Sequence, residues 1–245
     1  MGSSIAWNLA KSGLTSELIV IEPDPTYEFA ATPRVIGGIR FVQGLIENLK
    51  MSLYGRYVFK NFARELNIQE DFVDLNFHEC GYLFLGTGNT VKAFEENYTM
   101  LSDGGADIKL MDRRSLESLL PSFNFKDIDV GLYSPSDSRI DPYSALRGFK
   151  RAAIDLGVEY KKDRVVDINH DHRRVNSVKL ESGIFIPVDI IINAANCWAP
   201  DICKMVGMKV PIEPVRRQTF YFNMEKEIEK LPAIRDHNGL SVRPD

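Results

Sequence analysis

Two residues near the start of the chain have the types and the spacing of a dinucleotide site. Gly2 begins a stretch of apolar residues at helical spacing, and Glu22 follows the aliphatic run Leu18 to Ile21. The free N–H groups at a helix start favour phosphate, and an acid about 20 residues later accepts hydrogen bonds from ribose hydroxyls. The pattern predicts a βαβ unit with Gly2 and Ser3 at a pyrophosphate and with Glu22 and Pro23 at a ribose.

The first strand of such a unit would precede Met1, together with two of the three glycines in the usual G-x-G-x-x-G turn. We therefore expect a dinucleotide-binding fold that is open at its front edge. These residues alone suit any other βαβ segment equally well, because one glycine, one helix, one strand and one acid are a weak pattern. A nicotinamide dinucleotide is a further alternative, since Glu22 suits both kinds of cofactor.

The segment after Glu22 narrows this interpretation. It reads Pro23-Asp-Pro-Thr-Tyr-Glu-Phe-Ala-Ala-Thr32-Pro-Arg-Val-Ile-Gly37-Gly38-Ile-Arg40. This segment resembles the D-amino-acid oxidase and sarcosine oxidase family of FAD enzymes, above all the branch with the FAD-dependent oxidoreductase domain-containing proteins and the dimethylglycine and sarcosine dehydrogenases. In that family a loop of small residues and Ser or Thr follows the acid, and a Gly-Gly-Ile-Arg-like segment passes under the flavin. The resemblance implies that the phosphates lie at Ala31 and Thr32, and the flavin at Gly37, Gly38 and Ile39.

Three other places carry the same resemblance, which covers most of the chain. They are the strand around Gly81-Tyr-Leu, the helix that starts at Asp141-Pro142, and the turn Ala194-Ala-Asn-Cys-Trp198. The resemblance implies that further residues lie along the cofactor: Val165 and Val166 beside the adenine, and Ala194, Ala195, Asn196 and Trp198 in the turn. Asn196 replaces the usual glycine, and we expect it to adopt a left-handed backbone, which Asn tolerates better than most residues.

We expect an α/β protein with two discontinuous domains. One is a Rossmann-like FAD-binding domain that lacks its first strand, formed by residues 1–74 and 142–206. The other is an inserted α+β substrate domain with an antiparallel sheet, formed by residues 75–141 and 207–245. Family members continue well past the equivalent of Asp245, so the resemblance implies that the chain is truncated at both ends and that this last part is incomplete.

Hydrophobic spacing predicts the elements that would carry these residues. Helices are expected over 2–13, 45–66, 91–101, 116–120 and 142–157, and strands over 18–21, 79–86, 131–135, 164–168, 175–180 and 189–193. The aliphatic run at 18–21 is expected to be buried on both faces, and 189–193 is expected to be the most hydrophobic strand of the second half. Two further strands, over 211–222 and 239–244, are implied by the resemblance.

The resemblance implies oxidation of an amine carbon. A hydride passes from that carbon to the flavin, and water hydrolyses the resulting imine. A substrate with a carboxylate needs a cation near the flavin, and the planar guanidinium of arginine suits a carboxylate. Arg40 is the first candidate, because it ends the Gly-Gly-Ile-Arg segment, and Arg217 and Arg243 are further candidates. An ordinary surface arginine is the alternative at each position.

The expected substrate is therefore an amino acid or an N-methylated amine of the sarcosine, dimethylglycine or D-amino-acid type. Oxygen and an electron-transfer protein both stay open as the electron acceptor. A rival function is a non-catalytic flavoprotein that acts as an assembly factor for a respiratory complex, which the same branch of the family also contains. FAD is expected to be held without a covalent bond, because no His or Cys stands after Glu22 where covalent relatives attach it. An attachment site in the missing C-terminal part stays open as the alternative.

Composition limits the other classes of function. The net charge is −4, from 30 basic and 34 acidic residues, so no basic excess favours nucleic acid. The three cysteines form no C-x-x-C pair, which is typical of reduced thiols, and the four histidines have no metal-ligand spacing, so no metal is expected. No transmembrane segment or secretory leader is recognisable, and we expect a cytoplasmic protein, or a mitochondrial matrix protein in a eukaryote.

Overall fold

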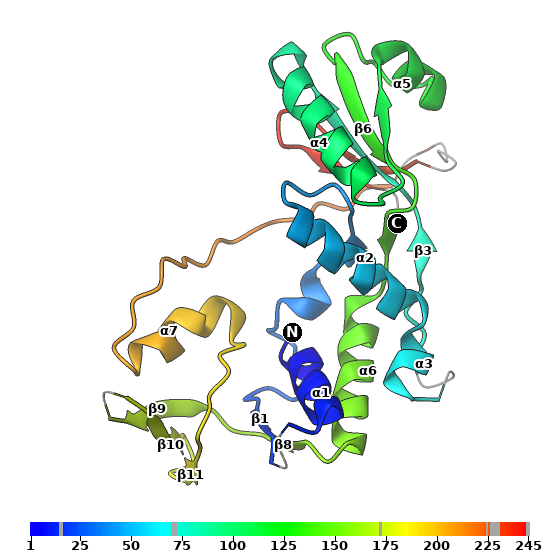
Figure 1. Ribbon diagram of the computed structural model, residues 1–245. Helices are drawn as coiled ribbons and strands as arrows, with labels where there is room; N and C mark the ends of the chain where they lie inside the picture. The colour runs from blue at the N-terminus through cyan, green and yellow to red at the C-terminus, as the bar shows by residue number, and fades with distance from the viewer. Residues whose placement is uncertain (15–16, 70–72, 172, 224, 226–230, 244–245) are drawn as a thin grey trace. The chain divides into compact units, whose positions relative to one another are not determined.

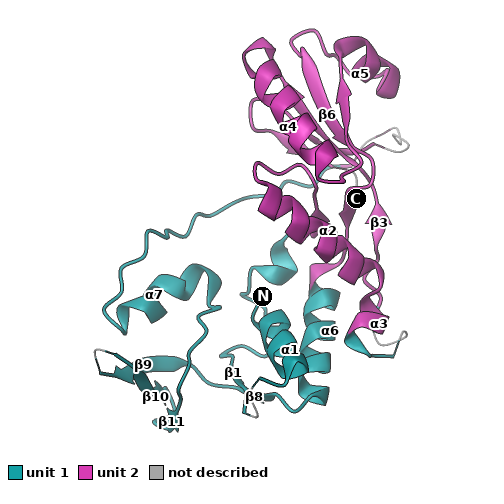
Figure 2. Cartoon of the chain, viewed as in Figure 1, with its two compact units in different colours: residues 1–35, 66–73, 143–222 teal, residues 36–65, 74–142, 223–245 magenta. Residues whose placement is uncertain are grey.

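The computed structural model describes residues 1–14, 17–69, 73–171, 173–223, 225 and 231–243. The chain forms two compact units, each assembled from segments that are distant in sequence (Figure 2). Unit 1 comprises residues 1–35, 66–73 and 143–222, and unit 2 comprises residues 36–65, 74–142 and 223–245. Each unit has its own sheets.

Unit 1 combines a parallel pair of strands with a small antiparallel sheet (Figure 1). Its elements, with α6 starting at the unit boundary, are α1 (Gly2–Ser12), β1 (Ile19–Ile21), η1 (Thr32–Arg34), α6 (Pro142–Asp155), β8 (Glu159–Lys161), β9 (Val165–His170), β10 (Val175–Leu180), β11 (Phe185–Pro187), η4 (Asn196–Trp198) and α7 (Ala199–Lys204). β1 pairs with β8 in parallel, and β9, β10 and β11 form an antiparallel sheet.

The two long helices of unit 1 begin and end where the sequence predicts. α1 ends at Gly13, whose φ of 67° is the left-handed value that closes helices, and its N–H bonds to the carbonyl of Ala10. α6 begins at Pro142, where a missing N–H is not needed by the helix. Trp7 of α1 packs against Phe149 of α6 with ring centroids 5.6 Å apart. This contact packs α1 against α6.

Two predicted strands of unit 1 are wrong. Residues 189–193 form no strand, and the side chain of Ile190 is 79% exposed. Residues 211–222 are also without strand structure and are exposed throughout. An aliphatic run becomes a buried strand only where neighbouring strands cover it, and neither run has such a neighbour within the described residues. For the same reason β1 is not covered on both faces, since Ile19 is 40% exposed.

Unit 2 is built around a five-stranded sheet with the order β13-β12-β4-β6-β5. Its elements, with α3 ending at the unit boundary, are β2 (Gly38–Ile39), α2 (Ile46–Lys60), α3 (Phe62–Leu66), β3 (His78–Glu79), β4 (Tyr82–Gly86), η3 (Gly88–Thr90), α4 (Val91–Asp103), β5 (Lys109–Met111), α5 (Arg113–Leu119), β6 (Val130–Ser134), β7 (Ser138–Arg139), β12 (Ala233–Arg235) and β13 (Ser241–Val242). β12 is parallel to β4, the other pairs are antiparallel, and β2, β7 and β3 form a second small sheet.

Both faces of the large sheet are buried. Successive side chains of a strand point to opposite faces, so Leu83 of β4 joins one cluster with Leu116 of α5. Phe84 packs on the other cluster, which contains Leu49 of α2 and Leu101 of α4. The sheet therefore lies between α5 on one face and α2 with α4 on the other (Figure 1).

Two predicted elements of unit 2 are each divided. The helix expected over 45–66 is α2 followed by α3, because the backbone leaves the helical region at Asn61. The side-chain amide of Asn61 donates to the carbonyl of Tyr57 at 2.8 Å. The strand expected over 79–86 is β3 followed by β4, because Gly81 has a φ of 70°. The turn at Gly81 brings β3 into a different sheet from β4.

Candidate functional site

The N-terminus of α1 is a place where unit 1 can bind an anion. The first intrahelical bond runs from the N–H of Ile5 to the carbonyl of Met1 at 3.0 Å, and no side chain caps the helix start. An α-helix leaves the first N–H groups without partners in the helix, and its dipole favours negative charge there. A Cβ added at Gly2 would lie 3.6 Å from the Cβ of Ala194, so the structure brings these two predicted residues together.

Glu22 lies directly after β1 and is half-buried. Its N–H donates to the carbonyl of Lys161 at 3.0 Å, and its Oε1 accepts from the N–H of Asp24 at 3.0 Å. Burial raises the pKa of Glu22, while the Asp24 amide and the charges of Lys150 and Arg164 oppose this shift. The carboxylate is thus held at a strand end with acceptor capacity left, as the recognition of two hydroxyl groups requires.

Three aromatic and polar residues beside Glu22 were not predicted from the sequence. Tyr27 is buried and has a φ of 59°, and the Nζ of Lys150 lies 5.0 Å from its ring centroid and 5.2 Å from that of Tyr160. Burial raises the pKa of both phenols, and the Ser3 side chain lies close to both. The cluster joins the loop after β1 to α1, α6 and β8. Its members are up to more than 150 residues apart in sequence, so the periodicity of the sequence could not predict these contacts.

The remaining predicted residues of unit 1 lie at element ends. Ala31 and Thr32 start η1 and are half-buried, Pro23 is exposed, and Val165 and Val166 begin β9. Asn196 has a φ of 51°, the left-handed backbone expected where it replaces glycine. Ala195 donates its N–H to the side chain of Asn193 at 3.2 Å, and Trp198 is 47% exposed.

A cavity of about 400 Å³ in unit 2, which is wide open to solvent, contains the main candidate for substrate binding. Its wall combines β2 and the segment after it with residues of α2, and the lining residues are Gly38, Ile39, Arg40, Gln43, Asn48, Met51, Ser52, Gly55 and Phe59. The Arg40 guanidinium lies 6.0 Å from the ring centroid of Phe84, and among the described residues it makes no hydrogen bond or ion pair. Gln43 donates to the carbonyl of Arg40 at 3.0 Å and to Ser52 at 3.2 Å. The cavity therefore holds a cation whose donors are available.

The two glycines before Arg40 are required by the packing of unit 2. Gly37 has a φ of 71°, and a Cβ there would overlap the carbonyl oxygen of Ile140. The N–H of Ile140 in turn donates to the carbonyl of Gly37 at 3.0 Å. A Cβ at Gly38 would overlap the hydroxyl of Tyr82. β2 pairs with β7, so that Ile39 lies opposite Ser138 and is buried.

The other two candidate arginines have different surroundings. Arg243 follows β13 in unit 2 and donates to the carbonyl of Ile36 at 2.8 Å, so the structure brings it to the segment that ends in Arg40. Arg217 belongs to unit 1, on the exposed stretch without helix or strand structure.

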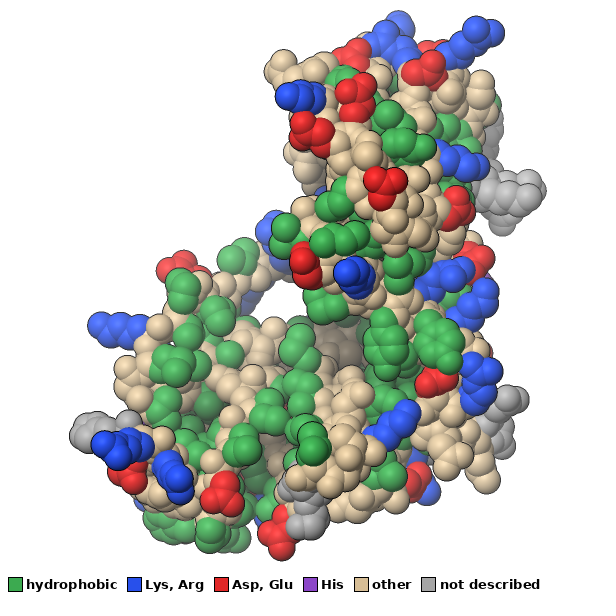
Figure 3. Space-filling view, in the orientation of Figure 1, with side chains coloured by type: hydrophobic (Ala, Val, Ile, Leu, Met, Phe, Trp, Pro, Cys, Tyr) green, Lys and Arg blue, Asp and Glu red, His purple; other side chains and the backbone are tan. Residues whose placement is uncertain are grey.

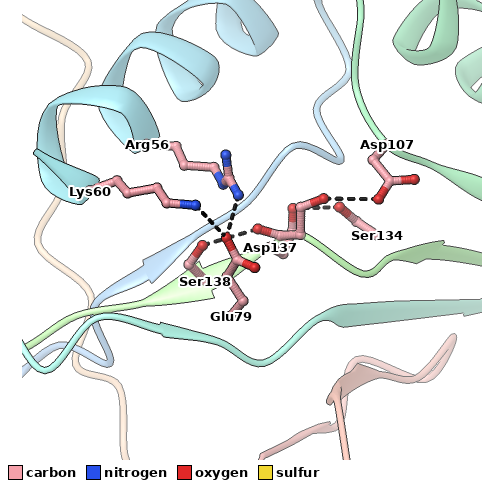
Figure 4. Close-up of polar contacts among 8 residues, drawn as sticks. Arg56, Lys60, Glu79, Asp107, Ser134, Asp137 and Ser138 are labelled. Carbon is pink, nitrogen blue, oxygen red and sulfur yellow. Dashed lines mark hydrogen bonds and ion pairs between the residues drawn. The ribbon is translucent and has the colours of Figure 1, made fainter.

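Asp137, in the turn between β6 and β7, is a fully buried carboxyl group that the sequence did not single out (Figure 4). Its Oδ1 accepts from the N–H of Phe41 at 2.9 Å and from the hydroxyl of Ser134 at 2.6 Å. Burial raises the pKa of Asp137 to about 7, against the effect of these two donors and of Arg40 and Arg56. Ser-Pro-Ser-Asp-Ser reads as an exposed turn, which is why sequence reasoning missed it.

Three further observations concern surface charge, the described helices and metal-binding side chains. Lys and Arg side chains are interspersed with Asp and Glu on the visible face, without one basic patch (Figure 3). Within the described ranges no helix is long and apolar enough to cross a lipid bilayer. In the same ranges no three His, Cys, Asp or Glu side chains gather as they would around a metal ion.

Comparison with known proteins identifies the family. The model of the DAO family, FAD dependent oxidoreductase, matches residues 1–245. The chain belongs to this family. FAD-dependent oxidoreductase domain-containing protein 1 of Xenopus laevis is 28% identical over 281 residues, covering 99% of this chain and 56% of that protein. Dimethylglycine dehydrogenase, mitochondrial, of Homo sapiens is 26% identical over 246 residues, covering 98% of this chain and 27% of that protein.

A solved structure shows the same fold. L-proline dehydrogenase from P. horikoshii superimposes with a TM-score of 0.75 at 24% identity, covering 97% of this chain and 62% of that one. The predicted family, the fold class with its Rossmann-type FAD-binding fold, and FAD as the cofactor of the family are confirmed. The chain spans just over half the length of the FAD-dependent oxidoreductase domain-containing relatives that it matches.

Proposed function

We propose that this DAO-family protein oxidises a small amine that carries a carboxylate, either an amino acid or an N-methylated amino acid. The main support is Arg40, a guanidinium without an ion pair in the described residues, which lines a cavity of about 400 Å³. Burying a carboxylate is costly unless a cation and hydrogen-bond donors receive it, and the fork of arginine supplies both. The name of the human relative, dimethylglycine dehydrogenase, supports a substrate of this class.

The groups of unit 1 fit the adenosine diphosphate part of FAD. The free N–H groups at Gly2 and Ser3 suit the pyrophosphate, and the half-buried Glu22 suits the ribose hydroxyls. The proposal keeps the other predicted cofactor residues, which are Pro23, Ala31, Thr32, Gly37, Gly38, Ile39, Val165, Val166, Ala194, Ala195, Asn196 and Trp198. FAD, held without a covalent bond, supplies the hydride acceptor for the amine carbon.

The residues of the chain then orient the substrate. Arg40 binds the carboxylate and so fixes which carbon is presented for oxidation, because a two-point contact restricts the substrate to few orientations. The side-chain amide of Gln43 donates to the backbone carbonyl of Arg40 and to the hydroxyl of Ser52 on α2, and so holds the Arg40 backbone. Arg243, bonded to Ile36, and Arg217 are kept as further carboxylate contacts.

The proposal has three further parts. Residues 1–74 and 142–206 form the FAD-binding domain, and residues 75–141 and 207–245 form the substrate domain. Electrons leave the protein to oxygen or to an electron-transfer protein. In a eukaryote the protein works in the mitochondrial matrix, in line with the mitochondrial relative, and elsewhere in the cytoplasm.

The proposal is tested by anaerobic addition of amines to the FAD-loaded protein. We expect sarcosine, N,N-dimethylglycine or a D-amino acid to bleach the yellow colour, and expect no bleaching by acetate, which has the carboxylate but no amine. Protein that stays yellow with all three amines, and that instead binds subunits of a respiratory complex, would contradict the proposal and support the assembly-factor reading.

A further inference from the structure

We propose that Asp137 is a positioning residue for Arg40: its carboxyl group holds the backbone at Phe41 and thereby sets the Arg40 guanidinium at the cavity. This inference rests on the proposed role of Arg40 and adds a residue, 97 positions later in the sequence, on which that role depends. Asp137 lies in the turn between β6 and β7 and does not itself line the cavity.

The geometry links three chain segments at one residue. The Asp137 Oδ1 accepts from the N–H of Phe41, the residue that directly follows Arg40, at 2.9 Å. The Asp137 carbonyl accepts from the N–H groups of Cys80 at 3.1 Å and Gly81 at 2.9 Å, where β3 turns into β4. Ser134 at the end of β6 donates to the same Oδ1 at 2.6 Å. The large sheet thereby fixes Asp137, and Asp137 fixes the peptide bond that joins Arg40 to Phe41.

This anchor is needed because Arg40 has few restraints of its own. After β2 ends at Ile39, the next regular element is α2, which begins at Ile46. Between them the Arg40 carbonyl accepts from Gln43, and the Phe41 ring is buried against Leu49 in the same cluster. A guanidinium that recognises a carboxylate through two donors tolerates little rotation, so its backbone must be held.

The charges of Arg40 and Arg56 oppose the rise in the Asp137 pKa that burial causes. Arg40, Arg56, Cys80 and Tyr82 are among the titratable groups that interact electrostatically with Asp137. Its Oδ2 is buried without a hydrogen-bond partner in the described structure, as is the Nε of Arg56. Arg56 pairs with Glu79 instead (Figure 4). Its guanidinium lies 5.9 Å from the Phe41 ring centroid. The fully buried Asp137 therefore serves neighbouring residues and has no route to a ligand.

The test measures binding of acetate, a carboxylate that cannot be oxidised, to the FAD-loaded full chain by calorimetry. We expect Asp137→Ala to weaken acetate binding about tenfold, since the Phe41 amide loses its acceptor. Asp137→Asn keeps an oxygen acceptor and is expected to bind acetate within about threefold of wild type. Asp107→Asn, an exposed acid bonded to Ser136 in the same region, is the matched control and is expected to have no effect.

A double variant distinguishes a positioning role of Asp137 from a general loss of stability. In the Arg40→Met background, adding Asp137→Ala is expected to cause no further loss of acetate binding, because the two residues act through one contact. If Asp137→Ala fails to fold, Asp137→Thr replaces it, since Thr has a similar volume but its hydroxyl lies one atom short of the Phe41 amide. FAD content and the free energy of unfolding are measured for each variant, so that a purely structural effect is recognised.

The outcomes distinguish the two proposals. Wild-type acetate affinity in the folded Asp137→Ala or Asp137→Thr protein, together with weakened binding by Arg40→Met, would overturn the positioning role and leave the proposed function intact. An additional loss in the double variant would also overturn it. Wild-type affinity in Arg40→Met would instead overturn the role of Arg40, and the inference would fall with it.

Discussion

The Glu22 region of unit 1 and the Asp137 region of unit 2 each withdraw a carboxyl group from water, yet they do so in different ways. Glu22 is half-buried, has Lys150 and Arg164 nearby and accepts one amide from its own loop. Asp137 is fully buried and accepts from Phe41, which belongs to a distant segment. The difference suits the two proposed roles: Glu22 keeps acceptor capacity for a ligand, and Asp137 holds the segment with Arg40, the residue proposed to bind the substrate.

Two glycines of these units also differ in how closely other segments pack around them. Gly13 of unit 1 and Gly37 of unit 2 both have a φ near 70°, but a Cβ at Gly13 would have no neighbour within 4 Å, whereas one at Gly37 would overlap the backbone of Ile140. The turn at Gly13 only ends a helix. The turn at Gly37 must fit against another segment, and it places Arg40 three residues later.

The largest expected effect concerns the pH dependence of stability. The pKa of Asp137 is raised from 3.8 to about 7, so between these values the native chain holds a proton that the unfolded chain has lost. The free energy of unfolding should therefore fall as pH rises through this window, by up to about 4 kcal/mol in total. Asp137→Asn should lack this fall, and Asp107→Asn should retain it, as measured by urea denaturation from pH 4 to pH 8. Equal slopes in the two variants would contradict the buried state of Asp137.

The next effect compares the two glycines. Gly13→Ala should cost about 1 kcal/mol of unfolding free energy, the penalty for a side chain in the left-handed region. Gly37→Ala should cost about 3 kcal/mol, because the overlap with Ile140 adds to that penalty. Urea denaturation of both variants at one pH measures the difference. Similar values for the two would show that the segment before Arg40 is not held as tightly as described.

A smaller effect concerns the half-buried acid of unit 1. Glu22→Gln should weaken FAD binding about tenfold, since an amide replaces the charged acceptor for two hydroxyls. Because burial raises the pKa of Glu22 above 4.5, wild-type FAD affinity should also fall as pH decreases toward that value, and the variant should show less of this dependence. Fluorescence titration of the apoprotein with FAD measures both, with the exposed Glu28→Gln as the control. A variant that binds FAD like wild type would remove Glu22 from the cofactor site.

The sequence predicted what local chemistry determines. The end of α1 at Gly13, the start of α6 at Pro142 and the left-handed Asn196 follow from properties of single residues, and the structure confirms them. The family and its cofactor followed from short motifs around Glu22 and Arg40, although the roles of the individual site residues stay predictions.

Features that depend on distant segments were not predictable in the same way. The run at 189–193 has the composition of a buried strand, but a strand also requires a neighbour, and its composition does not reveal whether one exists. β12 pairs in parallel with β4 across about 150 residues of sequence. The bond from Phe41 to Asp137 joins residues 96 apart, and nothing in a Ser-Pro-Ser-Asp turn indicates a buried carboxylate.

The most direct test of the account compares two amines that differ only in the carboxylate group, N,N-dimethylglycine and trimethylamine. Their second-order rates of anaerobic flavin reduction are measured in the FAD-loaded wild type, in Arg40→Met and in Arg114→Met, which alters an exposed arginine of α5. We predict that wild type and Arg114→Met prefer dimethylglycine by about 100-fold, and that Arg40→Met loses most of this preference. An undiminished preference in Arg40→Met would contradict the assignment of the cavity in unit 2 as the site that binds the substrate carboxylate.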